Sequence, residues 1–183
     1  MLKHSRAISG FKKSIPVDFL LHWIPEESDC LSELVYLLKS PLSLPVWKFY
    51  IERFIQFHFF KTKSKLKTAV IPIPGSQKGK TAYHTKYFAK AWQQFMPCEI
   101  LDCLGHEADS LQQKDLTLKQ RGQTQFSLLE DFTTRLYQQE RVVVIDDIVT
   151  SGNTLQSSLM ALKPFLRRDC VIEIKALLSR DKI

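Results

Sequence analysis

The stretch VVVIDDIVTSGNTL, from Val142 to Leu155, places two adjacent carboxylates directly after an apolar run and follows them with hydroxyls and a glycine. The carboxylates of Asp146 and Asp147 can accept hydrogen bonds from neighbouring hydroxyl groups. Gly152 lets the backbone approach an anion closely, and a helix that begins after it offers free N–H groups. Hydroxyl binding at one end and anion binding at the other fit a ribose 5-phosphate. The expected phosphate-binding residues are Thr150, Ser151, Gly152, Asn153 and Thr154.

A structural interpretation of the same stretch is a strand that ends in an acidic turn, followed by a Ser/Thr helix cap. An isolated Asp-Asp pair would favour that interpretation. The complete order of four β-branched residues, two acids, two apolar residues and Thr-Ser-Gly-x-Thr favours ligand binding.

Short apolar strands and amphipathic helices alternate over most of the chain, which predicts an α/β fold with a mostly parallel sheet and helices on both faces. Ligands of such sheets bind beyond the carboxyl ends of the strands, and we expect the strand that starts at Arg141 to end at Asp146-Asp147. The polar residues 104–125 predict a long loop. The expected strands are 69–73, 98–101, 141–145 and 170–178, and the expected helices are 30–39, 47–58, 79–95 and 155–162.

Composition limits the remaining classes of protein. The 183 residues suit one well-buried domain, and no segment has the roughly 18 apolar residues of a membrane helix. The N-terminal segment has no secretory pattern, which predicts a cytoplasmic protein. The net charge of +7 favours an anionic partner. The four cysteines have no zinc-ligand spacing, so we expect no zinc.

The stretch around the acids resembles the phosphoribosyl pyrophosphate (PRPP) signature of type I phosphoribosyltransferases. In that family two acids hold the ribose hydroxyls and the next loop holds the 5-phosphate. The resemblance assigns these roles to Asp146 and Asp147, and to residues 150–154. It implies the family fold, with a small N-terminal helical hood (1–62) before a core (63–183), and it implies a homodimer.

Other segments resemble the ComF branch of this family, the competence-protein relatives. Ile71-Pro72-Ile73-Pro74 is similar to the branch's "VPVP", although the four-cysteine zinc ribbon usual in ComF proteins does not occur in this sequence. The resemblance places a pyrophosphate loop after that strand and a mobile segment at 113–126. The pyrophosphate loop would contain Pro74, Gly75, Ser76, Gln77 and Lys78. The catalytic candidates of the mobile segment are Lys114, Lys119 and Arg121.

The resemblance implies transfer of ribose 5-phosphate from PRPP to a nitrogen acceptor that the sequence does not identify. Mg²⁺ would act with PRPP, with Asp146 and Asp147 as further ligands. A different interpretation is a non-catalytic competence factor in DNA uptake that uses the fold as a ligand sensor or as an assembly protein that associates with DNA. A third is an RNA-binding regulator, with Phe59 and Phe60 as stacking surfaces beside a lysine run. That run (Lys61, Lys63, Lys65, Lys67) is interpreted first as a solvated connector and second as a nucleic-acid contact.

Overall fold

A computed structural model describes residues 5–8, 15–24, 30–37, 43–59, 65–75, 83–106 and 126–180 of the chain. The strands are β1 (Ser5–Ile8), β2 (Ile15–Trp23), β3 (Thr68–Pro72), β4 (Glu99–Ile100), β5 (Leu104–His106), β6 (Phe126–Leu128), β7 (Arg141–Val149) and β8 (Val171–Arg180). The helices are α1 (Cys30–Tyr36), α2 (Leu44–Phe59), α3 (Tyr83–Phe95), α4 (Thr133–Tyr137) and α5 (Asn153–Leu162), with the 3-10 helices η2 (Glu130–Phe132) and η3 (Lys163–Phe165).

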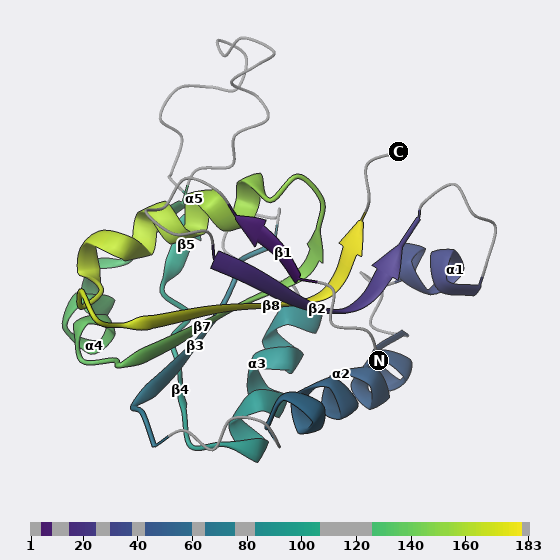
Figure 1. The fold of residues 1–183 in the computed structure, drawn as a ribbon, viewed down its shortest axis with the longest axis horizontal. Helices are drawn as coiled ribbons and strands as arrows, with labels where there is room; N and C mark the ends of the chain where they lie inside the picture. Colours follow the sequence, from purple (N-terminus) through teal and green to yellow (C-terminus); the bar gives the residue numbers. More distant parts are fainter. Residues whose placement is uncertain are drawn as a thin grey trace, which may run out of the picture.

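Six strands form one sheet in the order β1-β2-β8-β7-β3-β4. Every neighbouring pair in it is parallel except β1 with β2. The central strands β7 and β3 are almost fully buried, as expected for a parallel strand covered on both faces. The prediction of an α/β fold with a mostly parallel sheet and helices on both faces is confirmed (Figure 1).

Two apolar clusters fill the spaces between the sheet and its helices. Helix α5 packs on one face of the sheet, and helices α2 and α3 pack on the other (Figure 1). Alternate residues of β7 supply the two clusters, since successive side chains of a strand point to opposite faces. Val142 and Val144 face α5, while Val143 and Ile145 face α2 and α3. The central strand is therefore held on both sides, which fixes the residues at its carboxyl end.

The N-terminal part of the chain contains the two expected helices, α1 and α2, and also two strands that the sequence pattern did not predict. Strand β2 pairs in parallel with β8 from Val17, opposite Ile174, to Trp23, opposite Arg180. Helix α1 is joined to the end of β2 by a hydrogen bond from Trp23 Nε1 to Ser32 Oγ of 3.1 Å. The boundary at residue 62 stays a prediction.

Three local expectations were wrong. Strand β7 continues past the acids to Val149, because Ile148 and Val149 still pair with β8. The expected loop 104–125 begins with strand β5, which pairs with β6, and residues 107–125 lie outside the described residues. The helical pattern of residues 79–95 predicts that Tyr83 points inward, but Tyr83 is the first residue of α3 and is 54% exposed.

Candidate functional site

The acid pair lies near the carboxyl end of β7, between the end of β3 and the middle of β8. Asp146 pairs with Ala176 of β8, and the backbone N–H of Ile73, after β3, donates to the carbonyl of Ile145 at 2.9 Å. The acids thus lie at the edge of the sheet where a ligand was expected, although the strand itself ends three residues later.

Asp146 is a buried carboxyl group, with 7% of its surface exposed. Burial is the largest cause that raises its pKa well above the ordinary value, and the charge of neighbouring Asp147 raises it further. Its Oδ1 accepts a hydrogen bond from the backbone N–H of Asp147 at 2.9 Å. The nearby side chain of Asp147 thus favours the protonated form of Asp146. This costly arrangement is typical of a group that is kept for a ligand.

Asp147 is half-buried, and its Oδ1 accepts a hydrogen bond of 2.7 Å from the backbone N–H of Ile148. Each acid therefore uses Oδ1 to fix its side chain against the backbone. The two carboxyl groups offer several acceptor positions within one small region, which suits a pair of adjacent hydroxyl groups.

The loop after the acids leads directly into helix α5, and three of its residues are exposed. Thr150, Ser151 and Asn153 are exposed, Thr154 is half-buried and Gly152 is buried. Gly152 has φ 82° and ψ 0°, the left-handed conformation, at the residue that precedes the first turn of α5. The loop therefore turns sharply and presents the helix N-terminus, where N–H groups and the helix dipole favour an anion.

Replacing Gly152 with alanine should destabilise the protein by about 1–2 kcal/mol, because a Cβ is unfavourable in the left-handed conformation. Urea unfolding would measure the change in the free energy of unfolding. The exposed neighbour Ser151, replaced by alanine, is the matched control and should change stability little. Equal stability of the Gly152→Ala variant and the wild type would contradict the strained loop.

The expected pyrophosphate loop begins beside the acids. Pro74 is buried and Gly75 is half-buried. The pairing of Pro72 with Ile145 brings the beginning of this loop next to Asp146. Ser76, Gln77 and Lys78 lie outside the described residues, so their part in the site stays a prediction.

The catalytic candidates of the expected mobile segment, Lys114, Lys119 and Arg121, also lie outside the described residues. The two strands that flank the segment pair with each other, His106 opposite Phe126. The N–H of Phe126 donates to Ser157 Oγ of α5 at 3.2 Å. The described strands on either side of residues 107–125 are therefore paired, and Phe126 lies beside the helix that follows the phosphate-binding loop.

His84, which sequence reasoning did not include in the site, is buried at the start of α3. Burial lowers its pKa, while the negative charge of Asp147 acts in the opposite direction. The hydroxyl of Ser43 donates to the carbonyl of Leu37 at 2.8 Å, so its oxygen is left to accept from His84 Nε2 at 3.3 Å. The neutral imidazole then keeps Nδ1 as its acceptor, and the ring is near enough to Asp147 for that charge to act on the pKa of His84. The helical period that directs Phe88 inward also directs His84 inward, and was the available signal.

Within the described residues, no group of three or more His, Cys, Asp or Glu side chains could hold a metal ion by itself. No helix in the same part of the chain is long and apolar enough to cross a membrane.

No family model and no curated protein sequence matches this chain. Eleven chains of known structure match its fold. One, described as the structure of the allosteric regulatory enzyme of purine biosynthesis, matches with probability 1.00, a TM-score of 0.41 and 10% sequence identity. The match covers 70% of this chain and 25% of that enzyme, so the present chain spans about a quarter of the enzyme's length. A likeness of this size says nothing about chemistry.

Proposed function

We propose that this chain binds PRPP and acts as a phosphoribosyltransferase-like protein. The observation that carries the proposal is the acid pair of β7, in which Asp146 is buried, joined to the N-terminus of α5 by a short loop with a left-handed glycine. Asp146 and Asp147 accept the ribose hydroxyls, and residues 150–154 bind the 5-phosphate. The resemblance to the PRPP signature agrees with this assignment.

The proposed reaction moves the ribose 5-phosphate to a nitrogen acceptor. The bond between C1 and the pyrophosphate oxygen breaks, and its electron pair leaves with pyrophosphate. The lone pair of the acceptor nitrogen forms the C1–N bond. A proton on that nitrogen passes to solvent or to a base. The chain's contribution is to hold the ribose by its hydroxyls and its phosphate so that C1 faces the acceptor.

The acid pair fits a role beside Mg²⁺. The carboxyl groups of the adjacent residues Asp146 and Asp147 supply hard oxygen ligands that a divalent cation prefers. Mg²⁺ bound with PRPP would neutralise the charge of the departing pyrophosphate. Asp146 and Asp147 would hold it together with ligand oxygens, because the described residues offer too few side chains for a complete metal site.

The ComF branch is the finer part of the proposal. It rests on the sequence of residues 71–74, in which Pro72 ends strand β3 next to β7. Under this interpretation the protein is a competence-related factor, with or without transferase activity. Replacement of the catalytic candidates at 114, 119 and 121 would distinguish a factor with transferase activity from one without it. Loss of turnover without loss of PRPP binding would indicate an enzyme.

Calorimetric titration with PRPP, with and without Mg²⁺, tests the proposal. We expect binding that requires Mg²⁺, and a loss of affinity greater than about 100-fold in the double variant Asp146→Asn/Asp147→Asn, since hydrogen bonds to charged groups contribute about 1.5–3 kcal/mol each. The control removes two exposed acids of η2, Glu130→Gln/Asp131→Asn, and should bind normally. Unchanged affinity in the Asp146/Asp147 variant would overturn the proposed function.

A further inference from the structure

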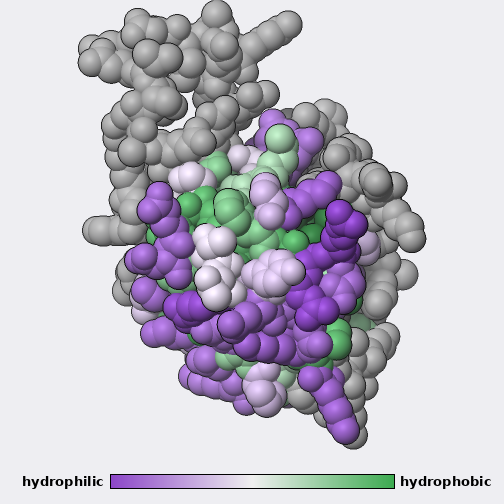
Figure 2. Space-filling model, turned by 90° about the vertical axis from the view of Figure 1, so that its left-hand side faces the viewer, coloured by the Kyte–Doolittle hydropathy of each residue, from purple (hydrophilic) through white to green (hydrophobic). Residues whose placement is uncertain are grey.

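A hollow of about 1050 Å³ lies at the amino-terminal ends of the parallel strands, whereas the acid pair lies near their carboxyl ends. Three segments that immediately precede the parallel strands β3, β7 and β8 line it. These segments contribute Lys67, Tyr137 with Gln138, and, before β8, Lys163, Pro164 and residues 166–169. Figure 2 views the molecule from the side of α4 and η3, and hydrophilic residues cover most of the lower part of that face.

The lining of the hollow is strongly basic. It contains four cationic side chains, Lys67, Lys163, Arg167 and Arg168, and one carboxylate, Asp169. Arg167 donates to Asp169 through Nε to Oδ1 at 3.0 Å and through Nη2 to Oδ2 at 2.7 Å, and the two side chains are 37% and 70% exposed. Because solvent reaches both side chains, the phosphate of an anionic ligand can compete with Asp169 for the guanidinium of Arg167. The excess positive charge attracts an anion with several negative groups.

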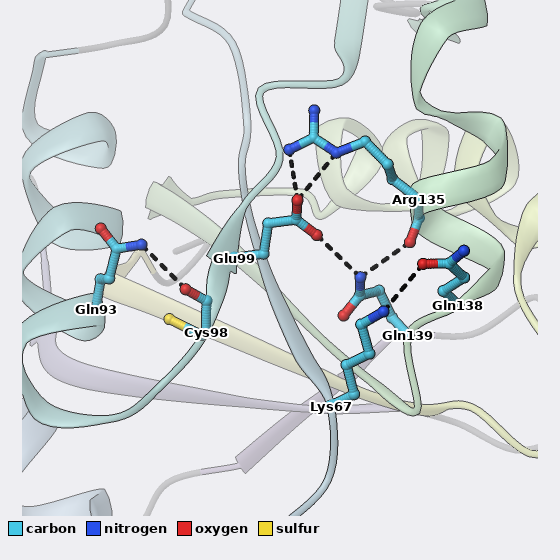
Figure 3. A network of polar contacts seen from close by, with 7 residues as sticks. All are labelled: Lys67, Gln93, Cys98, Glu99, Arg135, Gln138 and Gln139. Carbon is cyan, nitrogen blue, oxygen red and sulfur yellow. Dashed lines mark hydrogen bonds and ion pairs between the residues drawn. The ribbon is translucent and has the colours of Figure 1, made fainter.

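The base of the hollow is fixed by hydrogen bonds between the segments that form it (Figure 3). Lys67 Nζ donates to Gln138 Oε1 at 3.0 Å, and the backbone N–H of Lys67 donates to Glu140 Oε2 at 2.8 Å. The N–H of Val171 donates to the carbonyl of Glu140 at 2.9 Å. The beginnings of β3, β7 and β8 are thus held together, and the cations are displayed from a rigid edge.

Helix α4 is attached to the same edge by a second set of contacts. Arg135 donates through Nε and Nη2 to Glu99 Oε1 of β4, and buried Gln139 donates through Nε2 to Glu99 Oε2 at 3.1 Å (Figure 3). These contacts position Tyr137, which is 61% exposed at the hollow. An exposed aromatic ring held beside a group of cations offers a surface for stacking a base.

Pro164 and Leu166 add apolar surface among the cations. Inorganic phosphate would make no use of that surface or of the tyrosine ring. A strand of unpaired nucleotides would use all three kinds of group, with phosphates on the cations and bases on the ring and the apolar patch. Arginine, present here at 167 and 168, suits phosphate because its guanidinium donates two parallel hydrogen bonds.

We propose that this basic hollow binds single-stranded nucleic acid, with Lys67, Arg167 and Arg168 on the phosphodiester backbone and Tyr137 stacked on a base. The inference is independent of the PRPP proposal. Asp146 lies five positions along β7 from Arg141, which is beside the hollow, and this corresponds to roughly 16 Å of extended strand. A nucleic acid strand in the hollow therefore leaves the acid pair accessible.

Fluorescence anisotropy with a labelled thymidine oligonucleotide, measured over a series of salt concentrations, tests the phosphate contacts. The variant Lys67→Gln/Arg168→Gln should weaken binding at least tenfold and reduce the slope of log K against log salt by about 1.4, since each phosphate contact to a single strand contributes about 0.7. The control Lys48→Gln/Lys90→Gln removes two exposed charges of α2 and α3 and should keep affinity and slope. Equal losses in both variants would show unspecific attraction to a basic protein and overturn the site.

The stacking contact and the kind of ligand are tested separately. Tyr137→Ala should weaken oligonucleotide binding by about tenfold, whereas Tyr137→Phe, which keeps the ring, should bind as the wild type does. Unlabelled single strand should displace the probe, while duplex DNA or free nucleoside triphosphate should not at the same nucleotide concentration. Displacement by the triphosphate or by the duplex would overturn the assignment to a single strand. The Asp146→Asn/Asp147→Asn variant should bind the oligonucleotide normally, so that failure of either proposal can be told from failure of the other.

Discussion

Replacing Asp146 with asparagine should make the protein more stable at neutral pH while removing much of its affinity for PRPP. Asparagine keeps an oxygen that can accept the N–H of Asp147, now bonded to Asp146 Oδ1 at 2.9 Å. It removes the charge that the buried position disfavours. A single substitution would therefore separate what stabilises the fold from what binds the ligand, a conflict common at functional sites.

The sign of the pH dependence follows from the direction of the pKa shift. Burial raises the pKa of Asp146 well above 3.8, so the folded protein holds this proton more tightly than the unfolded chain does. The stability that this group contributes is fully present below about pH 3.8 and is lost as pH rises through the folded-state pKa. Asparagine does not titrate, so the asparagine variant loses no stability from this position as pH rises. Its advantage over the wild type should therefore be small in acid, increase with pH and then become constant.

Urea unfolding of both proteins between about pH 4 and pH 8 measures this difference. The lowered pKa of His84 makes stability decline in both proteins as pH falls below 6.5, and this contribution largely cancels in the comparison. Asp131→Asn, at an exposed position of η2, is the control and should show no such increase with pH. A variant less stable than the wild type at neutral pH would show that the Asp146 carboxylate stabilises the fold, contrary to the burial argument.

The elements around the acid pair could be predicted because local pattern and tertiary environment agree there. Val142 to Ile145 is apolar at every position, which suits only an element covered on both faces, and β7 has apolar clusters on both. The glycine at 152 and the hydroxyl residues around it predicted the start of α5 within two residues. The arrangement Asp146, loop and helix N-terminus follows from that order alone.

Strand β2 could not be predicted, because its sequence IPVDFLLHW is interrupted by Pro16, Asp18 and His22. Asp18 is stabilised in the sheet by Lys175 Nζ of β8, which donates to its Oδ2 at 2.5 Å from 157 residues away. The basic hollow could not be predicted either, because it also depends on residues that are far apart in the sequence. Lys67 is part of a run that also fits a solvated connector, and its neighbours at 137–138 and 163–169 become adjacent only when the parallel strands align.

The buried charges of β2, β7 and β8 form a continuous chain, and its central member is Glu173. Glu173 Oε1 accepts an ion pair from Arg141 Nη2 at 2.7 Å, and its Oε2 accepts one from Lys175 Nζ at 2.9 Å. The side chains of Arg141 and Lys175 are only 4% and 5% exposed. Since Arg141 Nε and Nη1 are buried without a hydrogen-bond partner, Glu173 is the group that compensates the Arg141 charge.

Replacing Glu173 with alanine should therefore destabilise the protein by about 3–5 kcal/mol, because it leaves a buried guanidinium without its carboxylate. Lys175 retains its ion pair with Asp18, so the loss of stability arises mainly from the uncompensated charge of Arg141. The double variant Arg141→Met/Glu173→Ala should recover part of the loss, and a double-mutant cycle in urea unfolding would measure the coupling. Asp169→Ala, which breaks an exposed pair with Arg167, is the control and should change stability little. If the double variant is as unstable as the two single losses added together, Glu173 acts through packing and the charges of this chain are not coupled.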